Sequence, residues 1–292
     1  MAFMKIMGDF NMSNIILGWP NRADLVTLSG GSWTSLDNLK NRNTYALARS
    51  TNATTGSTQF DIDLGTTNFS LRALTLHSHN LSVNASWRVT IGTTAGGDDV
   101  YDSGTNSVWD VSFDTDLFQF DQSAYWSDTL NDQNIRSQFS IITTFGDIAR
   151  PNQYIRVEIL DAGNSDGYVE IGRLGVWSGF QPTYNAVYGL QHGWQDESDV
   201  GFAQSGEMNY EKKKAKRTAN LAFDFLSDSE AGILYELMRR SGITGEVMYI
   251  PNPADLTYSQ RYGFRGTLRR LGGLERTSLN LDSLEIQAIE LI

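Results

Sequence analysis

The sequence predicts a mainly β protein: a β-sandwich followed by a smaller α+β module with one prominent helix. Stretches of alternating apolar and polar residues, the period of a half-buried strand, recur along the chain. Its 292 residues are enough for one large or two ordinary domains. The 27 glycines, with many Asn, Ser and Thr but only 5 prolines, indicate a folded and turn-rich protein.

The first predicted domain covers residues 1–182 and contains six such stretches. In "YIRVEIL", residues 154–160, Ile155, Val157 and Ile159 fall on one face and the polar residues on the other, as in a half-buried antiparallel strand. The six stretches are "YALARS", "TQFDIDLG", "LRALTLHSHN", "ASWRVTIG", "QYIRVEILD" and "YVEIGRLGVW".

An inserted excursion at about residues 98–135 interrupts these strands. It is rich in Asp, Ser and aromatic residues and has no clear period, and long irregular loops in a compact domain are usually functional or interface-forming. Its aromatic residues are candidate contacts for a glycan or a partner protein, unless they pack under their own segment. These candidates are Trp109, Phe118, Tyr125 and Trp126.

The second predicted domain, residues 183–292, carries the helix. Ser227 is a suitable N-cap, and Glu230 three residues later completes a capping box. Leu234, Leu237 and Met238 follow on one face, Arg239 and Arg240 suit the negative C-terminal end, and Gly242 suits the C-cap. Extended runs surround the helix: "RTANLAFDFL", "GEVMYIP", "YGFRGTLRRL" and "TSLNLDSLEIQAIEL".

An extended arm, about residues 185–217, opens this domain and has segregated charges. In a ring of identical subunits, opposite charges on neighbouring copies can set register and partner choice, whereas on a monomer the same segment is a solvated strand. We therefore expect the arm to be an intersubunit or partner-binding element. The candidate interface residues are the acidic Asp196, Glu197 and Asp199 and the basic Lys212, Lys213, Lys214, Lys216 and Arg217.

Several blocks, in order, resemble a known family. "FDIDLG", "LRALTLHSHNLSVNASWRVTIG" and "YIRVEILDAGNSDGYVEIGRLGVWSGFQP" resemble the discoidin or galactose-binding-like jelly-roll sandwich of virion proteins from tailed bacteriophages. Residues 183–292 resemble a module of tail-tip proteins related loosely to the distal-tail and tail-tube folds. The resemblance implies a structural tail-tip protein that forms a homo-oligomeric ring or collar and joins the tube, hub and fibres, with no catalytic residues.

A carbohydrate-binding module is the alternative function. Galactose-binding-like folds often bind glycans, and the excursion supplies aromatic and carboxylate side chains that can hold a sugar. Such a site in a tail protein would serve recognition of a host surface glycan. Fold alone does not establish this function.

Two groups of residues are weak candidates for metal binding. His77 and His79 are two positions apart in a strand, so alternation puts them on one face; the alternative is that the strand ends at His79 and Asn80 shapes a corner. Asp161, Asn164 and Asp166 have a spacing similar to a calcium loop, but the same residue types form ordinary turns.

Catalysis and cofactors are not expected. The sequence has no G-x-S-x-G elbow, no H-E-x-x-H and no phosphate-binding glycine loop with its lysine. It also has no cysteine, which excludes disulfides and thiolate chemistry. We expect a protein that is not an enzyme and has no bound cofactor.

Charge and hydropathy limit the partners. The 23 Lys and Arg against 34 Asp and Glu give a net charge of −11, which opposes binding to nucleic acid. There is no apolar run long enough to span a membrane, and the first residues lack the pattern of a signal peptide. The expected location is the phage tail of a virion, after assembly in the host cytoplasm.

Overall fold

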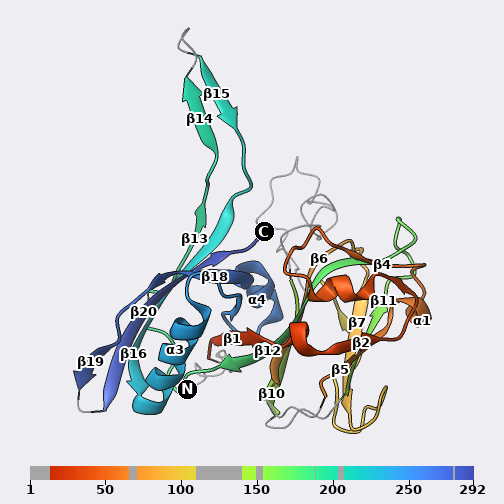
Figure 1. Cartoon of the computed structure of the whole chain (residues 1–292), viewed down its shortest axis with the longest axis horizontal. Helices are drawn as coiled ribbons and strands as arrows, with labels where there is room; N and C mark the ends of the chain where they lie inside the picture. The colour runs from red at the N-terminus through yellow and green to blue at the C-terminus, as the bar shows by residue number, and fades with distance from the viewer. Residues whose placement is uncertain are drawn as a thin grey trace, which may run out of the picture.

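The computed structural model describes residues 14–65, 71–109, 140–148, 154–187, 189–202, 207–278 and 280–292. Over these residues the protein is mainly β, as predicted, with a 12-stranded sheet, a six-stranded sheet and a two-stranded ribbon. The N-terminal and C-terminal parts lie side by side, and the ribbon stands out from the body (Figure 1).

The N-terminal part is a sandwich of two sheets. Its strands are β2 (Thr27–Ser29), β3 (Trp33–Thr34), β4 (Ala48–Ser50), β5 (Phe60–Asp63), β6 (Leu71–His79), β7 (Ser86–Gly92), β8 (Tyr101–Asp102), β9 (Asn106–Ser107), β10 (Ile141–Ile148), β11 (Tyr154–Leu160) and β12 (Glu170–Phe180). The six-stranded sheet has the order β2-β5-β11-β7-β8, with β9 beside β7. Short helices η1 (Ala23–Leu25), η2 (Leu36–Lys40) and α1 (Thr55–Thr58) connect the strands.

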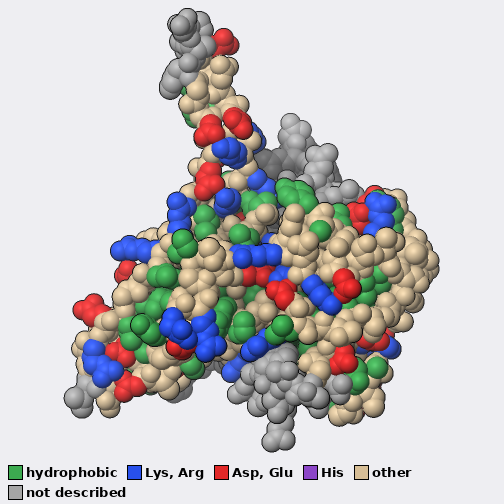
Figure 2. All heavy atoms as spheres, in the orientation of Figure 1, with side chains coloured by type: hydrophobic (Ala, Val, Ile, Leu, Met, Phe, Trp, Pro, Cys, Tyr) green, Lys and Arg blue, Asp and Glu red, His purple; other side chains and the backbone are tan. Residues whose placement is uncertain are grey.

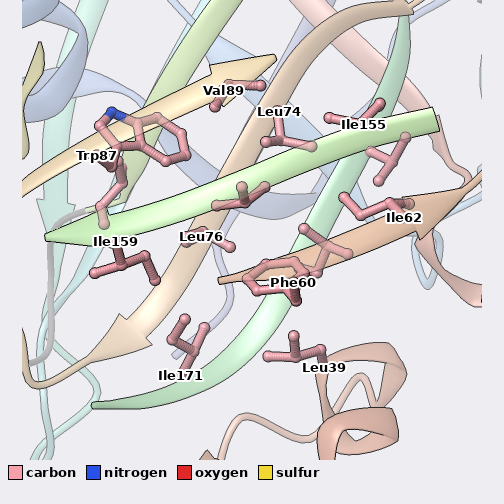
Figure 3. Packing of buried hydrophobic residues seen from close by; sticks show 14 of the residues in the cluster. Leu39, Phe60, Ile62, Leu74, Leu76, Trp87, Val89, Ile155, Ile159 and Ile171 are labelled. Carbon is pink, nitrogen blue, oxygen red and sulfur yellow. The ribbon is translucent and has the colours of Figure 1, made fainter. Parts of the chain in front are cut away.

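The core of this sandwich lies between the two sheets (Figure 3). In β11, Ile155, Val157 and Ile159 are fully buried, while the residues between them are partly exposed. The predicted alternation of this strand is confirmed. On the facing sheet, Leu74 of β6 and Ile171 of β12 complete the packing.

The C-terminal part consists of curved antiparallel strands packed on one helix. Its elements are β13 (Gln191–Gln195), β14 (Asp199–Phe202), β15 (Met208–Glu211), β16 (Lys216–Ser227), α3 (Asp228–Ser241), β17 (Val247–Ile250), α4 (Leu256–Tyr262), β18 (Phe264–Leu271), β19 (Glu275–Ser278) and β20 (Leu281–Glu290). Helix α3 covers one face of β16, β20 and β18 (Figure 1).

The predicted helix is confirmed in detail. The Ser227 side chain accepts a hydrogen bond from the Glu230 backbone N–H, and the Glu230 carboxylate accepts one from the Ser227 N–H, which completes the capping box. Leu234 and Leu237 are buried in the core of the C-terminal part. Gly242 ends the helix with φ of 52°, a region that favours glycine.

A single strand joins the two parts. Strand β1 (Ile16–Asn21) pairs with β12 on one side and with β17 on the other, so the order β10-β6-β12-β1-β17-β18-β20-β16-β13 forms one continuous sheet. A small apolar cluster that includes Ile16, Trp177 and Met248 packs at this junction. The indole N–H of Trp177 donates to Thr75 Oγ1 (2.8 Å). A Cβ atom at position 175 would collide with both of these atoms, so only glycine fits there.

Candidate assembly interface

The predicted arm is a β-hairpin that projects from the body. Strand β13 leaves the edge of the large sheet, β14 and β15 pair with each other alone, and the chain then returns into β16. Figure 2 shows the hairpin clear of the body, with acidic side chains along it and basic ones toward its base. A two-stranded ribbon without a core is marginally stable in water.

The two faces of the ribbon differ in chemistry. Val200 lies opposite Tyr210, and Asp199 lies opposite Glu211. Because side chains alternate along a strand, Val200, Met208 and Tyr210 share one face. These side chains are 52%, 51% and 67% exposed. The Tyr210 hydroxyl donates to Met208 Sδ at 3.0 Å, so an exposed apolar stripe runs along one side of the arm and acidic groups lie on the other.

Opposite charges of the arm pair within one chain. Lys213 Nζ lies 2.5 Å from Asp199, and Lys216 Nζ lies 2.7 Å from Glu197. The hydrogen bond from Lys216 holds the pKa of Glu197 below its usual value. These charges therefore do not need a neighbouring copy to be paired, as the sequence had suggested, because the hairpin itself brings the two strands together.

The remaining charged candidates lie near the base of the arm. Asp196 accepts a hydrogen bond from the Ser198 N–H (2.8 Å). Lys212 is exposed, and its positive charge helps to lower the pKa of Asp196 after the hydrogen bonds from Ser198. Lys214 is exposed at the surface and lines a cavity beside Glu290, where partial desolvation lowers its pKa.

Buried contacts fix the base of the arm to the body. Arg217 is 6% exposed, forms an ion pair with Glu290 (2.6 Å) and donates to the carbonyl oxygen of Arg261 in α4 (3.2 Å). On β13, His192 Nε2 is hydrogen-bonded to the Tyr249 hydroxyl (3.0 Å), and burial lowers the His192 pKa. Arg217, predicted as an exposed interface residue, instead anchors the arm.

His77 is a buried, hydrogen-bonded residue. Its Nδ1 lies 2.7 Å from Ser140 Oγ, and its Nε2 lies 2.7 Å from Thr75 Oγ1. Burial, with the charges of Arg265 and Arg173, holds its pKa well below the usual value. With both ring nitrogens engaged, the imidazole has no position left for a metal.

His79 lies against different neighbours from His77. Ser78 has a left-handed φ of 56°, which breaks the alternation on which a shared face depends. The His79 ring packs 5.3 Å from the ring of Trp109, and His79 pairs across the sheet with Ile171 of the sandwich core. The strand does end at His79, so of the two interpretations the structure favours the corner.

The Asp161 segment is a hydrogen-bonded turn. The buried Asp161 carboxylate accepts hydrogen bonds from the Ser82 N–H (2.9 Å), the Ser82 hydroxyl (2.5 Å) and the Asn164 amide (2.8 Å). Asp166 accepts from the Asn80 amide (3.0 Å), whose oxygen in turn accepts from a backbone N–H of β12. Donors surround these oxygens where a calcium ion would need further oxygen ligands.

The Trp109 side chain packs against the protein and does not project into solvent. It lies against the sandwich core, and its indole N–H donates to the Ser82 carbonyl oxygen (2.8 Å). This placement corresponds to packing under its own segment, the alternative to a glycan contact. Phe118, Tyr125 and Trp126 lie outside the described residues.

A buried ionic network at the junction of the two parts was missed from the sequence. Arg173 of β12, fully buried, pairs with Glu246 (2.7 Å) and Asp24 (2.7 Å), and Arg265 of β18 pairs with the same Glu246 (2.8 Å). Its paired members are up to 149 residues apart in sequence, so no local pattern indicates them. The network holds the sandwich to the C-terminal part.

The described residues hold neither a cluster of metal-ligating side chains nor a membrane-spanning helix. They contain no group of three or more His, Cys, Asp or Glu placed to hold a metal ion. Among these same residues, no helix is long and apolar enough to cross a membrane.

In comparisons with known proteins, no family model matches the chain, and no curated protein is detectably similar to it.

Proposed function

We propose that this chain is a structural component of a phage tail tip, which assembles as a homo-oligomeric ring or collar and links the tail tube to fibres or host-binding proteins. The observation that carries the proposal is the projecting hairpin β14–β15 with its exposed apolar stripe. The sequence resemblance to tail-tip proteins supports it.

An uncovered arm is energetically unfavourable for a free monomer. Val200, Met208 and Tyr210 expose apolar surface on a ribbon that has no core of its own. Covering that stripe with another subunit removes apolar surface from water at about 25 cal/mol per Å². A stripe that docks on a different patch of the next copy makes a heterologous contact, and heterologous contacts form a closed ring when the rotation between copies closes.

Carbohydrate binding through the excursion is less well supported. The one described aromatic residue of that set, Trp109, packs against the sandwich core. We therefore keep assembly as the main function.

Sedimentation velocity of the purified chain tests the proposal. The wild-type chain is expected to form a closed oligomer of the 32.5 kDa subunit, visible as rings in electron micrographs. A variant with Val200→Ser, Met208→Ser and Tyr210→Ser should sediment mainly as a monomer with an unchanged circular dichroism spectrum.

The matched control replaces an exposed apolar residue of the sandwich. Leu25 is 77% exposed and lies in η1 of the N-terminal part, whereas the hairpin rises from the C-terminal part (Figure 1), so Leu25→Ser should leave the oligomer intact. A wild-type chain that stays monomeric, both alone and with phage tail proteins, contradicts the proposal. So does an oligomer that the arm variant does not weaken.

A further inference from the structure

The outer face of the C-terminal sheet carries a row of polar side chains. Gln191, Asn220, Gln287 and Arg270 are successive cross-strand neighbours on β13, β16, β20 and β18. Residues directly opposite one another point to the same face. The intervening residues Leu221 and Ile286 point the other way, into the core beneath α3.

This row lines a concave site. A cavity of about 340 Å³ is bounded by the four polar residues, by Glu285, which lies two residues from Gln287 along β20, and by Leu190. That volume falls within the range of about 300–1,000 Å³ typical of small-molecule sites. Leu190 also packs on the core, so it gives the cavity an apolar wall.

Most of the polar groups in the cavity have no protein partner. The Asn220 amide donates to Gln191 Oε1 at 3.3 Å. Within the ranges that the structure describes, the side chains of Arg270, Glu285 and Gln287 form no hydrogen bond or ion pair. These three side chains therefore belong neither to a buried hydrogen-bond network nor to a surface ion pair.

The chemistry of these groups selects a class of ligand. Three amides and a carboxylate accept hydrogen bonds, and the amides and the guanidinium donate them. One Arg and one Glu together carry no net charge, which disfavours an anion or a cation. A neutral molecule with several adjacent hydroxyl groups, each both donor and acceptor, can satisfy this set, and its C–H face can rest on Leu190.

We propose that this cavity binds a neutral sugar unit, such as one hexose of a polysaccharide. The site lies in the C-terminal part and includes Leu190 and Gln191 at the base of the arm, but no residue of the hairpin β14–β15. A shallow site of this size holding one sugar ring is expected to bind weakly, with Kd on the order of 1 mM.

Ligand-observed NMR titration of the full chain tests the proposal. The probes are glucose, galactose, mannose and N-acetylglucosamine, with glucuronate as an anionic probe. At least one neutral sugar should bind, and Arg270→Met, Gln287→Ala and Glu285→Gln should each weaken it about tenfold. Arg240→Met removes an exposed arginine from α3, on the opposite face of the sheet, and should leave binding unchanged.

Three results overturn the proposal. The first is no binding of any neutral sugar. The second is binding that the three cavity variants leave unchanged, because the sugar then sits elsewhere. The third is preferred binding of glucuronate that Glu285→Gln strengthens, which identifies an anion site at Arg270. Circular dichroism shows that each variant is folded, which is expected because the substituted side chains lie at the surface.

Discussion

Replacing Glu246 by glutamine is expected to destabilise the protein strongly. The Glu246 carboxylate is shared by two buried arginines: Arg173 is fully buried and Arg265 is 4% exposed. The substitution keeps the shape of the side chain but leaves Arg265 without its carboxylate and Arg173 with Asp24 alone. Breaking a buried pair in this way costs about 3–5 kcal/mol, because a desolvated charge is left uncompensated.

The loss is large against a typical unfolding free energy of about 5–15 kcal/mol. Urea unfolding at neutral pH, followed by circular dichroism and tryptophan fluorescence, measures it as a lower midpoint at unchanged slope. The matched control is Glu236→Gln. Glu236 pairs with Arg239 and Arg240 on the exposed face of α3, where removing a surface pair costs about 0–1 kcal/mol.

Equal effects of the two substitutions refute the reasoning, because burial would then have no influence on the cost of an unpaired charge. Separate unfolding of the sandwich in Glu246→Gln would support the reasoning, since the network joins the two parts. If both parts still unfold together with only a small shift, the network does not hold them together.

Three further predictions concern the capping box, acid stability and a buried histidine. Ser227→Ala should cost about 1 kcal/mol in urea unfolding because the first turn of α3 loses its cap, and no change would mean that Glu230 alone suffices. Burial would raise the pKa of Glu246, but the hydrogen bond and charge of Arg173 and the charge of Arg265 lower it overall. Stability from Glu246 is therefore complete above its ordinary pKa of 4.5 and is lost as pH falls below it; a urea midpoint that does not fall in this range contradicts the assignment. The imidazole NMR signals of His77 should not titrate between about pH 7.5 and 5.5, because burial keeps the ring neutral; a midpoint near 6.5 would mean that the ring is solvated.

Elements whose signals are local can be predicted from the sequence. The capping box of Ser227 and Glu230 and the apolar face with Leu234 and Leu237 involve residues a few positions apart, so the pattern locates α3 with its caps. Alternation likewise predicts the strand Tyr154–Leu160 and its buried face. The segment 185–217 was expected to be extended, but its return as a paired hairpin was not foreseen.

Contacts between residues that are distant in sequence depend on the tertiary structure. Strand β1 joins two parts of one sheet because its two edges find partners more than 150 residues away. A single left-handed residue, Ser78, separates His77 from His79, and folding of the arm pairs Lys213 with Asp199 inside one chain. The row from Gln191 to Arg270 exists because the register of four strands aligns it. Periodicity reports on neighbours along the chain, whereas register and long-range ion pairs depend on how whole strands dock.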